Sequence, residues 1–300
     1  MSSITSFPCP TTLTPGRGAG HGFFAVSSDG HAVREPGVGA RWQGVPVMLK
    51  TPAEVAAMRP AGRFVAGVLS SLRDVAKVGM TLQQLDDHAH RMIDDAGAHS
   101  VYLGYHPSFG AMPYPGVLCT SVNDAALHGL PSDYVLADGD VLSIDFAAQV
   151  QGWVADSALT FQLGTTTPDA QRLIATTEEA LAAGIAAAQV GGRMGDVSAA
   201  IGQVGHRAGY GINTDFGGHG VGRTMHEDPH VPNDGRRRSG MKLQAGLVVA
   251  IEPWFMAGGS GYVVDDDGWT IRSADGSLAA HAEHTVALTK DGPVVLTARD

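Results

Sequence analysis

Two aspartates stand in apolar segments where a carboxylate is costly. Asp145 closes the apolar run 141–144, and Asp156 lies in the next apolar segment. Aspartate is disfavoured inside strands, and a buried carboxylate needs a cation or hydrogen bonds. A hairpin that turns near residues 151–152 would bring both carboxylates to one pocket. Taken alone, a pair of surface or turn aspartates explains the pattern equally well.

A glycine-rich stretch, residues 217–229, supplies two candidate histidines. His219 and His226 are seven residues apart, and Glu-Asp-Pro follows the second. Glycine allows the backbone to approach a ligand closely. The spacing differs from that of two zinc ligands on one helix, which are four residues apart. A structural role is the general alternative for each histidine, but a pair in so glycine-rich a stretch favours a site.

Two glutamates occur in similar apolar surroundings. Glu252 follows the run 248–251, where an unpaired carboxylate would be costly, and Glu283 is a weaker candidate because an exposed strand position would also explain it. With Asp145, Asp156 and His219 they supply four carboxylates and one imidazole. Such a set can hold two divalent cations that clamp a hydroxide for attack on a carbonyl or phosphoryl group. An oxygen-dominated set without thiolate favours Mn, Fe or Co, allows Zn and disfavours Cu.

The composition indicates a globular protein that is not built for nucleic acid. Of 300 residues 44% are apolar and 17% charged, and the formal net charge is -10, whereas phosphate binding needs a basic surface. No apolar run approaches the ~20 residues of a membrane span, and no secretory signal begins the chain. The two cysteines, Cys9 and Cys119, are far apart, so no disulfide framework is implied. We therefore expect a cytoplasmic protein.

The first part of the chain differs from the rest. Residues 1–47 are rich in Gly, Pro, Ser and Thr without a period of 2 or 3.6 residues, so we expect a flexible tail. From Met48 to residue 300 the sequence predicts one folded domain. It opens with a helix, for which Thr51 fits the N-cap, Pro52 the first position and Glu54 the capping box. We hypothesise that Met48 is the natural start or the edge of the folded unit, which the intact mass of the natively expressed protein would test.

The folded domain repeats itself. Residues 82–96 and 194–208 both fit amphipathic helices that end at Ala-Gly, with apolar positions at a constant offset of 112. A longer helical stretch precedes each of them, about 52–77 with an interruption at Pro60, and 168–189. Strand-like runs follow, at 116–121, 140–149 and 153–162 in the first half and at 246–256, 283–289 and 293–297 in the second. Chance similarity is the alternative, but the matched order favours two helix-plus-sheet halves with a cleft between them.

The motifs around these residues resemble the type I methionine aminopeptidases of peptidase family M24. They are the aspartate pair, Gly-His219-Gly-Val-Gly-Arg with His226-Glu-Asp-Pro, Ile-Glu252-Pro and Glu283-His-Thr. Residues 121–131 and 267–283 match two further segments of that family. The resemblance covers about residues 50–298. It implies the pita-bread fold, an α+β architecture with an internal pseudo-two-fold duplication and an antiparallel sheet flanked by helices.

The resemblance also implies a role for each candidate ligand. Asp156 and Glu283 would bridge two divalent cations, whether Co, Mn, Fe or Zn. Asp145 would chelate one cation, and His219 with Glu252 would complete the other. Glu252 would in addition be the general base for the bridging water, a role that suits a carboxylate in an apolar surround.

Two further histidines are implied to contact the substrate rather than the metal. His128 and His226 resemble the family's histidines that stabilise the tetrahedral intermediate, an electrostatic role. The pocket for the methionine side chain would comprise Tyr105, His106, Cys119 and Trp269. Aromatic faces favour contacts with sulfur, which suits a thioether. For Cys119 an ordinary buried cysteine is the alternative.

Four features depart from the family's pattern without removing a ligand. Met225 stands where Phe is common, Leu127 where Cys is frequent, and Ala147 where Thr often supplies a hydrogen bond near the ligands. Residues 107–116 form a longer stretch than in the shortest members and would border the pocket. These differences bear on the shape of the pocket.

The function implied by the resemblance is removal of the initiator methionine from nascent proteins whose second residue is small. A metal-bridged hydroxide would attack the first peptide bond, and the role implies a transient ribosome encounter by a monomer without a membrane partner. A prolidase or aminopeptidase P shares the fold and ligands, but the lack of an extra N-terminal domain and the presence of Asn123 with His128-Gly-Leu-Pro argue against it. A non-catalytic binding module would have an eroded ligand set, whereas all five ligands are present.

Overall fold

A computed structural model describes residues 47–107, 110 and 112–299, together with two short strands, β1 (Ala25–Val26) and β2 (Ala32–Val33), that pair antiparallel. The chain divides into one unit of residues 1–37 and a second of residues 38–300. The rest of the expected tail falls outside the described residues. Among the residues described, no helix has both the length and the apolar character needed to cross a membrane.

The described part of the second unit contains four α-helices: α1 (Pro52–Val75), α2 (Leu82–Ala96), α3 (Pro168–Ala187) and α4 (Met194–Ala208). The capping box of α1 is confirmed, since Thr51 Oγ1 accepts from the Glu54 amide at 3.3 Å and the Glu54 carboxylate accepts from the Thr51 amide at 2.8 Å. The interruption expected at Pro60 is wrong, because α1 is continuous there. A proline inside a helix costs about 3 kcal/mol, and the buried face that includes Met58 and Leu69 offsets this cost.

The internal repeat is confirmed by the helices. α2 and α4 are each 15 residues long, and α4 begins and ends 112 positions after α2 does. Gly97 and Gly209 follow them in the left-handed conformation, with φ of 59° and 76°, where a side chain would be strained. Each half has its own buried apolar cluster, one that includes Phe146 and one that includes Ile201.

The strands form antiparallel sheets. One sheet contains β3 (His99–Ser100), β4 (Cys119–Val122), β6 (Val141–Val150) and β7 (Trp153–Gln162). A second has the order β10 (Glu227–Val231), β9 (Gly218–Gly220), β11 (Val248–Ile251), β16 (His284–Thr289), β17 (Gly292–Val295). Two three-stranded sheets join β15 (Ala279–His281), β12 (Trp254–Met256) and β8 (Gly211–Ile212), and β13 (Tyr262–Val264), β14 (Ile271–Ser273) and β5 (Ala125–Leu127). The expected α+β class with antiparallel pairing is confirmed.

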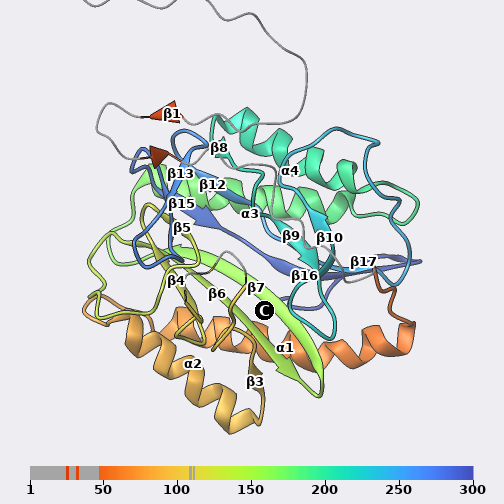
Figure 1. The fold of residues 1–300 in the computed structure, drawn as a ribbon, viewed down its shortest axis with the longest axis horizontal. Coiled ribbons are helices and arrows are strands. Elements are labelled where there is room, and N and C mark those ends of the chain that lie inside the picture. Colours follow the sequence, from red (N-terminus) through yellow and green to blue (C-terminus); the bar gives the residue numbers. More distant parts are fainter. Residues whose placement is uncertain (1–24, 27–31, 34–46, 108–109, 111, 300) are drawn as a thin grey trace, which may run out of the picture. The chain divides into compact units, whose positions relative to one another are not determined.

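Within the second unit, helices cover the strands from two sides (Figure 1). α1 contacts both β6 and β7, and α2 lies beside α1. α3 and α4 pack together on the opposite side, where α3 contacts β12 and β15. Because the strands lie between one helix pair from each half, side chains from both halves can meet in the interior.

The close approach of α1 to residue 296 leaves no room for a side chain at Gly62. A Cβ there would overlap the carbonyl group of Leu296. We expect Gly62→Ala to lower the free energy of unfolding by about 1–3 kcal/mol, because overpacking forces the backbone to shift. Gly67→Ala in the same helix, where nothing lies within 4 Å of the added Cβ, should raise it by about 0.5–1 kcal/mol. Urea unfolding curves measure both changes, and equal effects of the two variants would contradict this packing.

Candidate functional site

The hairpin of β6 and β7 places two predicted ligands on one face. In its register Asp145 lies opposite Ala158, and Asp156 lies opposite Ala147. The two aspartates are therefore diagonal neighbours, since directly opposed residues of an antiparallel pair share a face. On the other edge of β6, Asp145 is paired with Cys119 of β4. The hairpin expected from the sequence is confirmed, and both carboxylates line an interior cavity.

Glu252 and Glu283 occupy matching breaks in two paired segments. The sequence predicts one strand over 246–256, but the structure has β11 and β12 with Glu252 and Pro253 between them. Since β11 pairs with β16 and β12 pairs with β15, the partner segment breaks at Ala282 and Glu283. Both segments change sheets at this point. The break frees the two glutamates from strict strand alternation, and both line the same cavity.

His219 approaches the carboxylates from β9. Its Nε2 atom lies 3.5 Å from Glu252 Oε1 and 3.9 Å from Asp156 Oδ2. A Cβ at Gly218 or Gly220 would overlap backbone carbonyl groups of the neighbouring segments. The glycines on either side of His219 are thus required by the close packing of β9 between β10 and β11.

The cluster crowds four carboxylates into the interior. Burial, reinforced by the neighbouring carboxylates, raises the pKa of Asp156 and of Glu283 well above the ordinary values. Burial has the same effect on the pKa of Glu252, and it raises the pKa of Asp145 to about 6. Glu283 Oε1 is buried without a hydrogen-bond partner among the described residues. Carboxylates in this arrangement need a counter-charge to be ionised together.

This donor set fits divalent cations. Ligand atoms of Asp156, His219 and Glu283 lie within 4.8 Å of one another, and all three residues are buried. Burial lowers the pKa of His219 to about 4, so its ring is neutral. Its Nδ1 lies 3.0 Å from the Gly220 carbonyl oxygen, and donation there leaves the Nε2 lone pair free for a metal. A cation would neutralise the carboxylates and satisfy the unpaired Glu283 oxygen.

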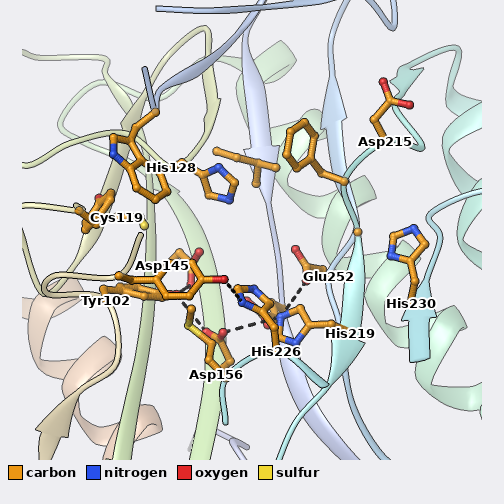
Figure 2. Close-up of a pocket in the computed structure, with 18 residues that line it drawn as sticks. Tyr102, Cys119, His128, Asp145, Asp156, Asp215, His219, His226, His230 and Glu252 are labelled. Atoms are coloured by element: carbon orange, nitrogen blue, oxygen red, sulfur yellow. Dashed lines mark hydrogen bonds and ion pairs between the residues drawn. The ribbon is translucent and has the colours of Figure 1, made fainter. Parts of the chain in front are cut away.

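The cavity beside the carboxylates also presents two histidines (Figure 2). His128 follows β5 and His226 precedes β10, so different sheets supply them. Burial lowers the pKa of His128 to about 4 and that of His226 well below its ordinary value, so both rings are neutral. The Tyr105 hydroxyl lies 2.9 Å from His226 Nδ1. The wall further includes Tyr102, Tyr114, Cys119, Leu127, Phe216, Met225 and Trp269.

The predicted pocket residues are placed unequally. Tyr105, Cys119 and Trp269 line the cavity. His106 is exposed, and its Nε2 lies 3.0 Å from the Gly110 carbonyl oxygen, within its own loop. The structure therefore does not bring His106 to the pocket.

Tyr102 is a site residue that the sequence does not reveal. Its hydroxyl donates to Asp145 Oδ1 at 2.7 Å and to Asp156 Oδ1 at 3.2 Å. The ring packs edge-on against Tyr114, with centroids 5.9 Å apart. Tyr102 lies in the connection between β3 and β4, where no strand or helix periodicity indicates the direction of a side chain. Only the folded chain shows that this hydroxyl faces the two aspartates.

A buried ion pair holds the segment that carries His226. Lys50 Nζ lies 2.6 Å from Glu227 Oε2, with side-chain exposures of 3% and 2%. The other Glu227 oxygen accepts from the Arg223 amide at 2.8 Å. The Arg223 guanidinium lies 3.5 Å from the centroid of the Trp153 ring at the end of the β6–β7 hairpin. The segment is thus fixed to both halves of the fold.

Comparison with known proteins agrees with this geometry. The profile of metallopeptidase family M24 matches residues 56–290. Methionine aminopeptidase 1 of Mycobacterium tuberculosis is 45% identical over 256 residues, which span 83% of this chain and 94% of that protein. The crystal structure of a Thermotoga maritima methionine aminopeptidase aligns with a TM-score of 0.80 at 36% identity, over 85% of this chain and 100% of the other. Prolidase from Pyrococcus furiosus shares the fold, with a TM-score of 0.66 at 19% identity over 85% of this chain and 66% of its own.

The crowding of the ligands predicts how stability depends on pH when metal is removed. Because the pKa of Asp145 rises from 3.8 to about 6 in the folded chain, ionisation over that window destabilises the folded state. In EDTA we therefore expect the Asp145→Asn variant to gain stability relative to the wild type as the pH rises from about 4 to about 7. Excess Mn²⁺ should reverse the order near pH 7, because the variant has lost a ligand. Calorimetric scans measure the difference, and a pH-independent gap in EDTA would contradict the prediction.

Proposed function

The chain belongs to metallopeptidase family M24 and removes N-terminal methionine by hydrolysis, and we propose that two divalent cations at the carboxylate cluster support this reaction. One observation carries the proposal: four carboxylates, of which those of Asp156 and Glu283 are buried and the other two partly buried, converge with His219 Nε2 on a cavity with aromatic walls. A pocket for an apolar side chain and a site for cations are thereby adjacent. Cleavage beside a bound methionine is the chemistry that such an arrangement supports.

The division of the ligands between two cations is proposed from the resemblance to type I methionine aminopeptidases. Asp156 and Glu283, whose carboxylates lie beside others of the cluster, would be shared by both cations. Asp145 would bind one cation, and His219 with Glu252 would bind the other. When bound, the cations lower the pKa of a water molecule and polarise the scissile carbonyl group.

Glu252 is the residue best placed to move the proton of the attacking water. It lines the cavity, and burial raises the pKa of its carboxyl group well above the ordinary value. A base with a raised pKa takes up a proton readily and can return it to the leaving amine. Glu252 therefore serves as general base and then as general acid.

The two neutral histidines supply hydrogen bonds to the reacting carbonyl group. The Tyr105 hydroxyl lies 2.9 Å from His226 Nδ1, and donation to that atom would select the tautomer that carries its proton on Nε2. His128 lines the same cavity, so both rings can donate to the oxygen that becomes negative in the transition state. Because both are neutral, they stabilise that charge without neutralising the nearby ligands.

The cavity wall suits an unbranched thioether. Tyr114 and Trp269 meet edge-on with centroids 5.1 Å apart, and Cys119 and Met225 add polarisable sulfur. Burial raises the pKa of Cys119 well above its ordinary value, so the thiol stays neutral and acts as a small apolar group. These contacts support recognition of a methionine side chain.

The physiological substrate is proposed from the similarity to methionine aminopeptidases. We propose nascent proteins with a small second residue, met by a cytoplasmic monomer in a transient encounter with the ribosome. Ribosome pelleting and size-exclusion chromatography of the purified chain test the encounter and the monomeric state. The alternative of prolidase activity is supported by the shared fold alone, because the Pyrococcus furiosus prolidase is only 19% identical to this chain.

The proposed substrate and the proposed role of Glu252 can be tested in one set of activity measurements. We expect the Mn²⁺-loaded protein to release methionine from Met-Ala-Ser and to leave Ala-Pro intact. Glu252→Ala should lower kcat by about 10²–10⁴-fold, the usual contribution of an acid–base group. Glu179→Ala, an exposed glutamate of α3, is the matched control and should change nothing. A preference for Ala-Pro would refute the proposed substrate, and full activity of Glu252→Ala would refute the mechanism.

Substitution of each histidine tests whether it stabilises the transition state rather than binding metal. His128→Ala and His226→Ala should each lower kcat by about 10²–10³-fold, because each removes a donor to the developing oxyanion. Neither residue is proposed as a ligand, so the Mn²⁺ affinity measured by titration calorimetry should stay within about threefold of wild type. Loss of metal binding in either variant would place that histidine among the ligands instead.

A further inference from the structure

His281 holds a buried imidazole that the mechanism above does not use. The residue ends β15, two positions before Glu283, and its side chain is 2% exposed. Among the described residues, its Nε2 has no hydrogen-bond partner. Buried polar atoms in native proteins are nearly always paired, so an unpaired one calls for a partner in the working enzyme.

The unpaired nitrogen faces two of the ligand carboxylates. His281 Nε2 lies 3.7 Å from Glu252 Oε2 and 4.0 Å from Glu283 Oε2. On the other oxygen of the same carboxylate, His219 Nε2 lies 3.5 Å from Glu252 Oε1. The Glu252 carboxylate therefore lies between two imidazole nitrogens, one facing each oxygen.

The backbone of His281 is fixed to the strand that bears a bridging ligand. Thr160 of β7 donates through Oγ1 to the His281 carbonyl oxygen at 2.7 Å and accepts from the His281 amide at 2.9 Å. The Ser143 hydroxyl of β6 lies 2.6 Å from the same Thr160 Oγ1. Since β7 also carries Asp156, the hairpin sets the position of His281 relative to the cluster. A hydrogen bond between the two side chains therefore requires the Glu252 carboxylate to approach His281 Nε2 from the present 3.7 Å.

We propose that His281 is a positioning residue of the metal centre, whose Nε2–H donates to Glu252 Oε2 in the loaded enzyme. This inference rests on the proposed function, since it gives Glu252 its orientation as ligand and base. A neutral imidazole has one N–H to donate, and the proposed hydrogen bond requires that proton on Nε2. With Oε2 held by His281, Oε1 stays directed toward the cation that His219 binds. Residues that hold a ligand in this way typically contribute 10–100-fold to metal affinity or activity.

Two substitutions separate hydrogen bonding from metal ligation. His281→Leu removes the donor, whereas His281→Gln keeps an N–H and is a poor ligand for Mn²⁺ or Co²⁺. We expect His281→Leu to weaken Mn²⁺ binding in titration calorimetry, and to lower kcat for Met-Ala-Ser, by about 10–100-fold. KM should change less than kcat. His281→Gln should restore most of both, and its Co²⁺ form should keep the visible absorption spectrum of the wild type.

The alternatives give different results. Wild-type Mn²⁺ affinity and kcat in His281→Leu would overturn the proposal. Equal losses in both variants, with an altered Co²⁺ spectrum in His281→Gln, would also overturn it and identify a nitrogen ligand. Melting in EDTA shows whether the variants fold. If His281→Leu does not, His281→Asn takes its place, because its shorter amide cannot reach Glu252 and the same losses are expected.

Two controls separate this proposal from the proposed function. His206→Gln changes an exposed histidine that pairs with Asp234, and it should leave affinity, spectrum and kcat unchanged. Failure of the wild type itself to release methionine would contradict the proposed function. Normal release by the wild type with no defect in the His281 variants would contradict only the role of His281.

Discussion

The crowding of four buried or partly buried carboxylates around one cavity is the constraint on which this structure depends. Like charges in an apolar interior cannot all ionise without a counter-charge. The chain supplies part of what is needed, since the Tyr102 hydroxyl donates to Asp145 and Asp156. The Arg299 guanidinium lies 2.7 Å from the Ser157 hydroxyl, and its positive charge lowers the pKa of Glu283, against the larger effect of burial. The divalent cations proposed for this site would supply the remaining counter-charge, and their binding would then also stabilise the folded chain.

This requirement also joins the two halves of the fold. The two aspartates come from the β6–β7 hairpin of the first half, whereas His219 lies within β9 and both glutamates lie in the breaks between strands of the second half. Neither half holds a complete set of ligands. The paired breaks at Glu252 and Glu283 allow both glutamates to face the cavity. Without a break, each segment would continue past the cavity as one strand of a single sheet. Cations bound between the halves would therefore stabilise the cleft that they occupy.

The segment that carries His226 is fixed in place by a buried ion pair. The Lys50–Glu227 pair is almost fully buried, and such a pair costs desolvation energy unless further hydrogen bonds satisfy it. Here the Arg223 amide supplies one. The pair links the residue before the α1 N-cap to the segment that carries His226. A rigid His226 can stabilise developing charge without first reorganising, which is the source of most electrostatic catalysis.

Local pattern was enough to predict the hairpin, the helices of the repeat and the polar residues that meet in the cavity, because each depends on nearby residues: alternation in strands, the 3.6-residue period, glycine after a helix and the cost of a carboxylate in an apolar run. Tertiary packing decided the rest. Pro60 did not break α1, because the helix is held by buried residues on another of its faces, which include Met58 and Leu69. The chain breaks at Glu252 because its neighbours pair in different sheets. Tyr102 and His281 became site residues only when distant strands turned them toward the carboxylates, a direction that no local sequence pattern records.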